Sequence, residues 1–187
     1  MKRLLDTTPD PLLLIARLVL GVVMFAHGSP LHVFDYDKLS GPRIQVRRAR
    51  QGEKMEILGG VEYAFDARDL LICDGEDRAI GIAGVMGGAN TEISGSTTEI
   101  ALETAWFEPN GVRLTSQRLA LRTEASARFE RGVDPLGVDY SVARFAAILR
   151  ESCPKLVVHA GATDARTRHL PKQPTVPLRV AQVNRVL

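Results

Sequence analysis

The sequence has few of the residues that bind metal ions or form covalent cross-links. Of its 187 residues only two are cysteines, Cys73 and Cys153, and four are histidines, which are scattered along the chain. No CxxC or Cys/His spacing predicts a metal site, so we expect no metal and two reduced, buried thiols. This use of cysteine is typical of a cytoplasmic protein.

The sequence also lacks a strong excess of charge of one sign. Its net charge of +2 is too small to indicate a nucleic-acid-binding protein by itself, because such proteins concentrate basic residues in a patch. The local basic run, "RRAR" from Arg47 to Arg50, is typical of a solvated strand face or sheet edge.

Long apolar runs are limited to the first 28 residues. The run from Pro11 to Ala26 is shorter than the ~20 residues of a membrane span, and Arg17 near its middle would cost about 2.5–3.5 kcal/mol on insertion. A signal peptide, a membrane anchor and a buried amphipathic helix all remain open for this segment. Residues 1–28 resemble the first helix of DoxX-like membrane proteins. No second apolar run follows, which excludes a multi-helix membrane protein, and we predict a junction near Ser29.

From Pro30 onward the apolar residues mostly alternate, which predicts strands, and helical spacing follows later in the chain. Strands are predicted in "RIQVRRAR", "KMEIL", "VEYAF", "LLIC", "RAIGIAG", "TEIALETAWF" and "KLVVHAG", and helices over 109–121, 123–131 and 136–152. Gly59-Gly60 predicts a hairpin turn, and Gly132 a helix end. Strands followed by helices indicate an α+β fold, preceded here by a short apolar helix. The proline-rich stretch 166–176 is predicted to be a linker.

Two features in the strand region are candidates for a site. "AGVMGG" places Gly84 and Gly87 after a strand, and without a P-loop lysine they more plausibly allow close approach of backbone to a strand or a ligand. Glu103 shares a strand face with Ala101 and Phe107, where an apolar residue is expected if that face is buried. A carboxylate there needs a partner, whereas on a solvated face it needs no explanation.

The stretch "LRTEASARFERGVDP" contains many charges around small residues. Glu124 and Arg128 are spaced i,i+4, which predicts a simple ion pair on a helix. Thr123 and Ala125 are small residues at the helix start, where they would cap the helix or line a pocket. His32 follows Pro30-Leu31 in a turn, where a histidine is more often packed than catalytic.

These runs together resemble the B3/B4 region of the bacterial phenylalanyl-tRNA synthetase β subunit. The matching segments include "PLHVFDYDKLSG", "LLICDGEDRAIGIAGVMGG" and "RTEASARFERGVDP", in order over residues 30 to about 165. The resemblance implies a domain of mostly antiparallel sheets with packed helices over 29–165. It also implies that residues 177–187, "PLRVAQVNRVL", are the truncated start of the next domain, B5.

The resemblance further implies an editing hydrolase that removes tyrosine wrongly attached to the phenylalanine tRNA. The family's pocket positions correspond to His32 and Glu103 as catalytic residues, and to Gly84, Gly87, Thr123 and Ala125 as substrate-binding residues. The implied partners are the acceptor end of tRNA(Phe) and the synthetase α subunit. No cofactor is implied for this domain, since ATP and Mg²⁺ belong to the α-subunit aminoacylation site.

The sequence departs from the family in one part of the pocket. The family carries a Thr-Asn pair twelve and eleven positions before the histidine, where this chain has Leu20 and Gly21. The pocket wall is therefore predicted to be incomplete. The alternative is a non-catalytic module for tRNA binding or subunit packing, within a chimera that residues 11–26 would tether to a membrane.

Overall fold

The computed structural model describes residues 5–6, 29–160 and 162–165, together with the single residues 175, 177 and 185. The strands are β1 (Leu5–Asp6), β2 (Leu31–Asp35), β3 (Gln45–Arg48), β4 (Lys54–Ile57), β5 (Val61–Ala64), β6 (Leu70–Cys73), β7 (Ala79–Ile82), β8 (Met86–Gly87), β9 (Glu99–Thr104) and β10 (Val157–Val158). The helices are α2 (Pro109–Arg118), α3 (Glu124–Phe129) and α4 (Val138–Ser152), with short 3₁₀ turns η1 (Tyr36–Lys38), η2 (Ala89–Thr91) and η3 (Pro135–Gly137).

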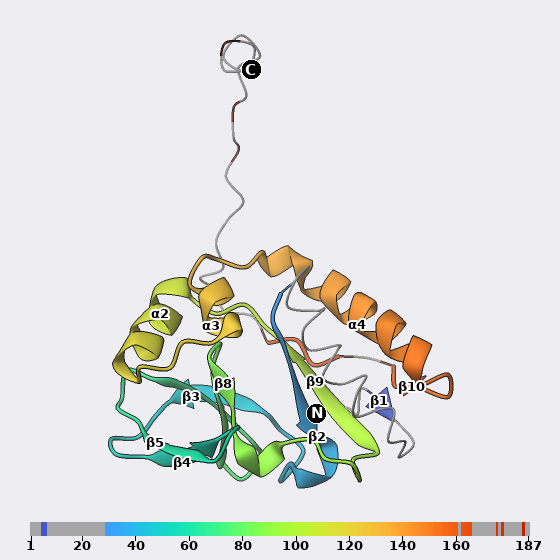
Figure 1. The fold of residues 1–187 in the computed structure, drawn as a ribbon, viewed down its shortest axis with the longest axis horizontal. Helices are drawn as coiled ribbons and strands as arrows, with labels where there is room; N and C mark the ends of the chain where they lie inside the picture. Colours follow the sequence, from blue (N-terminus) through green and yellow to red (C-terminus); the bar gives the residue numbers. More distant parts are fainter. Residues whose placement is uncertain are drawn as a thin grey trace.

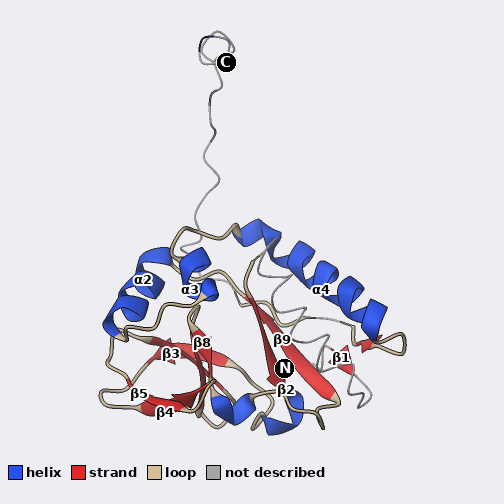
Figure 2. Ribbon diagram, viewed as in Figure 1, coloured by secondary structure: helices blue, strands red, loops and turns tan. Residues whose placement is uncertain are grey.

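The strands form antiparallel sheets, as the α+β prediction requires. One sheet has the order β10-β1-β9-β2, a second has the order β3-β6-β7-β8, and β4 and β5 form a hairpin. Helices α2 and α3 lie together above the second sheet, and α4 runs along the first sheet (Figures 1 and 2).

Two hydrophobic clusters correspond to these two halves. The larger contains side chains of the second sheet and the hairpin together with Val112, Leu119 and Phe129 from α2 and α3. The smaller joins Ile100 of β9 to Phe145 and Leu149 of α4. Strand β9 is therefore covered on both faces: its alternate side chains enter the two different clusters.

The predicted elements of residues 30–160 are present in this structure, although the helices predicted over 109–121 and 123–131 are shorter, at Pro109–Arg118 and Glu124–Phe129. Lys54–Ile57 and Val61–Ala64 form the hairpin, and Gly59 and Gly60 take positive φ in its turn. Gly132 follows α3 with a φ of +89°, a left-handed conformation that glycine adopts without strain. Both cysteines are free and buried.

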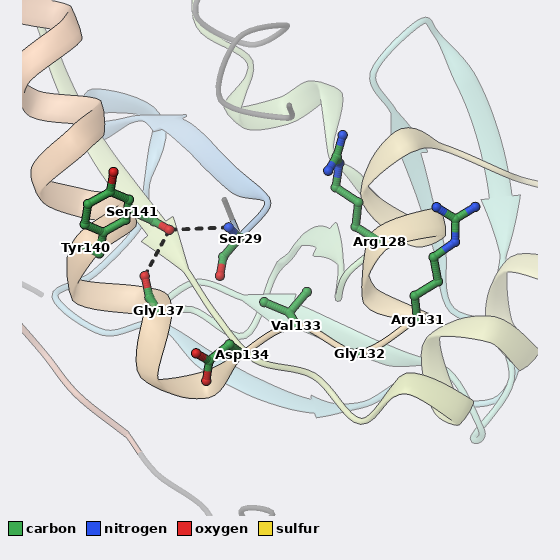
Figure 3. Close-up of a pocket in the computed structure, with 9 residues that line it drawn as sticks. All are labelled: Ser29, Arg128, Arg131, Gly132, Val133, Asp134, Gly137, Tyr140 and Ser141. Carbon is green, nitrogen blue, oxygen red and sulfur yellow. Dashed lines mark hydrogen bonds between the residues drawn. The ribbon is translucent and has the colours of Figure 1, made fainter. Parts of the chain in front are cut away.

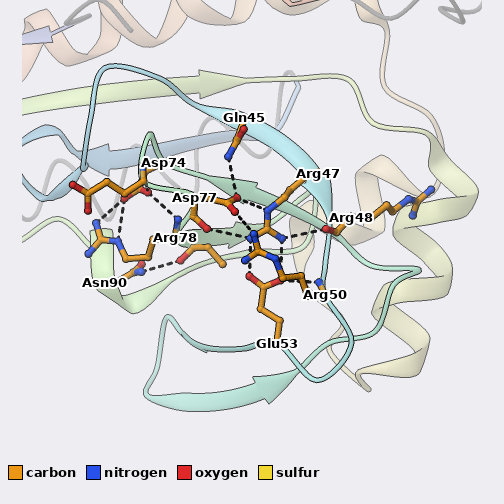
Figure 4. Close-up of polar contacts among 11 residues, drawn as sticks. Gln45, Arg47, Arg48, Arg50, Glu53, Asp74, Asp77, Arg78 and Asn90 are labelled. Carbon is orange, nitrogen blue, oxygen red and sulfur yellow. Dashed lines mark hydrogen bonds and ion pairs between the residues drawn. The ribbon is translucent and has the colours of Figure 1, made fainter.

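The basic run on β3 has a different environment from the one predicted. Strand β3 is at a sheet edge, as expected, but Val46 is 50% exposed while the Arg47 side chain is only 20% exposed. Arg47 is covered because its guanidinium binds Glu53 Oε1 at 2.8 Å and Asp77 Oδ1 at 2.5 Å (Figure 4). Ion pairing, not the alternation of apolar residues, determines which side of β3 is covered.

Several predictions fall outside the described residues. The apolar helix over 11–26, the positions of Leu20 and Gly21, and almost all of the linker and of the B5-like end lie there. Leu5 and Asp6, in the same N-terminal segment, form a strand that pairs with both β9 and β10. The part of the chain that the structure describes contains no helix with the length and apolar character needed to cross a membrane.

Candidate functional site

The centre of the candidate site is a pair of residues on neighbouring strands. In the β2–β9 ladder His32 lies directly opposite Glu103. Directly opposite residues of an antiparallel pair project to the same face, with Cβ atoms about 4.5–5.5 Å apart. Strand β9 directs Glu103 to the same side as Ala101, which is buried in the larger cluster, so this is the face that an apolar residue would ordinarily occupy.

His32 is held by two contacts from other parts of the sheets. Its ring packs edge-on against the Phe34 ring, with centroids 4.5 Å apart. It also covers Gly87: a Cβ built on this glycine would lie only 2.5 Å from the His32 Nε2 atom. Gly87 therefore makes the space that the imidazole fills, and burial lowers the pKa of His32 to about 4, which keeps the ring neutral near pH 7.

Glu103 has the opposite response to the same environment. Burial raises the pKa of its carboxyl group to about 7, because removal of water disfavours the charged form. Among the described residues we find no hydrogen-bond or ion-pair partner for this side chain. A carboxyl group that titrates near neutral pH beside a neutral imidazole is able to accept hydrogen bonds and exchange protons under physiological conditions.

Thr123 and Ala125, the predicted substrate-binding residues at the start of α3, have different surroundings. Thr123 is the N-cap of α3: its Oγ1 accepts from the Ser126 amide at 3.0 Å and donates to the Val85 carbonyl at 2.7 Å. Because Val85 lies between the glycines of "AGVMGG", this bond ties the start of α3 to the turn that carries Gly87. Ala125 is half-buried against the larger cluster. Their role in binding a substrate stays a prediction.

Gly84 is enclosed by the hydrophobic core. It has a φ of +72°, and an added Cβ would lie 2.9 Å from Val112 and 3.2 Å from both Phe107 and Phe129. This close packing accounts for glycine at the position, and its assignment to a substrate pocket also stays a prediction. The structure thus brings His32, Glu103 and Gly87 together and attaches Thr123 to the same turn.

Sequence reasoning missed a pocket at the end of α3. It has a volume of about 410 Å³ and lies between the end of α3 and the beginning of α4 (Figure 3). Its lining residues are Ser29, Arg128, Arg131, Gly132, Val133, Asp134, Gly137, Tyr140 and Ser141. Arg128 and Arg131 both fall within the helix predicted over 123–131, and their spacing of three residues there was the only sign of a shared surface.

The fold and the paired residues define an α+β domain with a protonatable pair on adjacent strands. The family model described as "B3/4 domain" matches residues 19–154. The chain belongs to this B3/4 domain family.

Similar curated proteins carry one name. The chain is 48% identical over 146 residues to a protein of Anaeromyxobacter dehalogenans named phenylalanine–tRNA ligase beta subunit, covering 78% of this chain and 18% of the relative. It is 44% identical over 169 residues to the protein of that name from Geobacter metallireducens, covering 90% and 21%. The chain thus spans about a fifth of the length of these relatives.

A solved N-terminal fragment of the phenylalanyl-tRNA synthetase beta subunit from Pyrococcus horikoshii has 15% sequence identity to the chain and a TM-score of 0.42. The match covers 66% of this chain and 44% of that one.

Proposed function

We propose that this domain hydrolyses the ester that joins tyrosine to a mischarged phenylalanine tRNA. The observation that carries the proposal is the His32–Glu103 pair, which lies on one face of the β2–β9 ladder with the His32 ring against Gly87. The names of the similar curated proteins supply the tRNA and the amino acid.

The chemistry of discrimination follows from the single hydroxyl by which tyrosine and phenylalanine differ. A pocket that binds phenylalanine by apolar contact rejects an added hydroxyl only weakly, so a second site is needed to remove tyrosine. Ionised Glu103 accepts a hydrogen bond from the tyrosine phenol. With phenylalanine the same half-buried carboxylate stays unpaired, which opposes binding of the correct product.

In the hydrolysis itself a water molecule supplies the nucleophile. Its oxygen attacks the ester carbonyl carbon, the bond from that carbon to the ribose oxygen breaks, and tyrosine and free tRNA result. Neutral His32 is positioned to accept a hydrogen bond from a polar group of the aminoacyl end, whereas its pKa of about 4 makes it a weak base near pH 7. We assign it to positioning, and Glu103 to recognition of the phenol.

The proposal includes the partners implied by the relatives. The acceptor end of tRNA(Phe) brings the ester to the pocket in the cytoplasm, and the ligase α subunit supplies the charged tRNA. Hydrolysis by water calls for no cofactor in this domain.

The test is single-turnover deacylation of Tyr-tRNA(Phe) by the full chain, with Phe-tRNA(Phe) as the second substrate. Glu103→Gln should lower the rate on Tyr-tRNA by about 10- to 100-fold, because the phenol loses a hydrogen bond to a charged acceptor, which is worth about 1.5–3 kcal/mol. The exposed Glu56→Gln on β4 is the matched control and should leave the rate unchanged. A parent rate equal to that of Glu103→Gln would favour the alternative of a non-catalytic module.

A further inference from the structure

The pocket between α3 and α4 has chemistry that the proposed reaction does not use. It is connected along the chain to elements of the candidate site at two points. Ser29 precedes β2, the strand that carries His32, and Arg128 and Arg131 lie at the end of the helix segment that begins at Thr123. The Ser29 amide donates to Ser141 Oγ at 3.3 Å, and that hydroxyl donates to the Gly137 carbonyl at 3.0 Å, which fixes the start of β2 to α4 (Figure 3).

One end of the pocket is cationic. Arg128 and Arg131 project to the same side of the chain in Figure 3. The predicted Glu124–Arg128 ion pair is not formed, and Glu130 instead binds Arg122 at 2.7 Å. Within the described ranges neither pocket arginine has an ion-pair partner, and the Arg128 Nε atom is buried without a hydrogen bond. A buried, unsatisfied guanidinium donor is costly, and a phosphate oxygen is the acceptor that it fits best.

The other end of the pocket is aromatic. Tyr140, in the first turn of α4, is 67% exposed, and Leu136, one helical turn before it, is 62% exposed. Tyr140 lies at the opposite end of the pocket from the two arginines (Figure 3). Proteins bind single-stranded nucleic acid with aromatic rings that stack on bases and with cationic groups that bind the backbone, and the two ends of this pocket supply one of each.

The pocket also contains a carboxylate, that of Asp134. Asp134 lies between these two ends, and its Oδ1 accepts from the Leu136 amide at 2.9 Å. Within the described residues its Oδ2 atom forms no hydrogen bond or ion pair, which leaves it free to accept one from a ribose hydroxyl. A carboxylate would repel phosphate if it lay among the arginines, but Figure 3 shows it directed away from them.

We infer that this pocket binds single-stranded RNA next to the candidate catalytic pair, with a phosphate on Arg128 and Arg131, a base on Tyr140 and a ribose 2′-hydroxyl on Asp134. The inference rests on the proposed function for the identity of the RNA, which would be the unpaired acceptor end of the tRNA. The pocket then fixes the strand while the aminoacyl group enters the space beside His32 and Glu103.

The experiment measures binding of a fluorescein-labelled RNA tetranucleotide, ACCA, to the full chain by fluorescence anisotropy. Tyr140→Leu should weaken binding about tenfold through loss of stacking, whereas Tyr140→Phe keeps the ring and should bind like the parent. Arg131→Gln should lower the slope of log affinity against log salt by about 0.7, the contribution of one phosphate of a single strand. The DNA tetranucleotide of the same sequence should bind more weakly than RNA.

Arg150→Gln, an exposed position at the far end of α4, is the control for loss of charge and should leave affinity and salt slope unchanged. Because Arg128 is partly buried, the exposed Arg131 carries the charge test, and circular dichroism checks the fold of every variant. Parent-like RNA binding by both Tyr140→Leu and Arg131→Gln would overturn the inference. If tripolyphosphate displaces the labelled ACCA as effectively as unlabelled ACCA does, the inference is also overturned. That result would indicate an anion site that does not recognise a base.

The tetranucleotide carries no amino acid, so this measurement is separate from deacylation. If Glu103→Gln abolishes deacylation but the pocket variants bind RNA normally, the proposed function stands and the pocket inference fails. If the pocket variants lose RNA while the parent shows no deacylation, the reverse holds.

Discussion

Ionisable side chains gather in two regions of the molecule, and they have partners in one region but not in the other. Around β3, Arg47 is bound by both Glu53 and Asp77, and Arg50 also contacts Asp77 (Figure 4). On the β2–β9 ladder Glu103 faces His32, and neither forms an ion pair within the part of the chain described.

The pKa directions express this difference. The Arg47 guanidinium lowers the pKa of Glu53 and of Asp77 through side-chain hydrogen bonds, so both carboxylates stay charged. Burial without a partner raises the pKa of Glu103 instead. A network in which the charged groups are paired stabilises the fold. A buried ionisable group without a partner is instead expected at a ligand-binding site.

The largest expected effect comes from Gly87→Ala, which acts on the unsatisfied region. The new methyl group would occupy the space of the His32 ring and displace it. A displacement of about 1 Å at a site typically costs about 100-fold in rate, and we expect that loss in Tyr-tRNA deacylation. Single-turnover kinetics measure it.

Two other glycines serve as comparisons. Gly95→Ala meets no atom within 4 Å and should leave the rate unchanged. Gly84→Ala forces a methyl group against Val112 at a positive φ and should lower the free energy of unfolding by about 1–3 kcal/mol. Parent-like activity of Gly87→Ala would show that the His32 position does not matter to the reaction.

Arg47→Met tests the satisfied region. It leaves Glu53 and Asp77 without their shared donor and should lower the free energy of unfolding by about 2–3 kcal/mol. Urea denaturation measures the change, and deacylation of the folded variant should equal that of the parent. Lys54→Met, which removes an exposed pair with Glu62, is the control and should leave the free energy of unfolding nearly unchanged. An equally small effect of Arg47→Met would remove the contrast between the two regions.

Local sequence patterns predicted most of the fold between residues 30 and 160. The Gly59-Gly60 turn, the helix end at Gly132 and the strand over Glu99–Thr104 follow from turn chemistry and spacing of two or 3.6 residues. Glu103 could be singled out because it interrupts an apolar strand face. Its partner could not be derived from spacing, since the register of β2 against β9 is a contact between distant segments.

The pocket beyond α3 shows the same limit. Arg128 reads as an ordinary helical ion-pair partner of Glu124, and Tyr140 as a surface residue in the first turn of a helix. Only the packing of α3, η3 and α4 places them around one space. The coverage of Arg47 on β3 could not be predicted for a related reason. Its partners, Glu53 and Asp77, lie in loops outside its own strand.

The smallest expected effect is a pH dependence that separates the two regions without a change of shape. Folding raises the pKa of Glu103 from 4.5 to about 7, so the folded state binds more protons than the unfolded state between these values. Stability from this group is therefore present at low pH and lost as pH rises through 7. Glu103→Gln removes the titration and should unfold about 1–2 kcal/mol less readily than the parent at pH 8.

The difference between Glu103→Gln and the parent should be much smaller near pH 5, where the folded carboxyl is largely protonated, and it approaches zero below pH 4.5, where the unfolded carboxyl is protonated as well. His32 acts in the opposite direction, because burial lowers its pKa from 6.5 to about 4 and the folded state loses stability as pH falls through that range. His32 is present in both proteins, so its contribution cancels in the comparison. Urea denaturation at pH 5 and pH 8 measures the difference, and a gap that stays constant with pH would mean that Glu103 is already charged and paired in the folded protein.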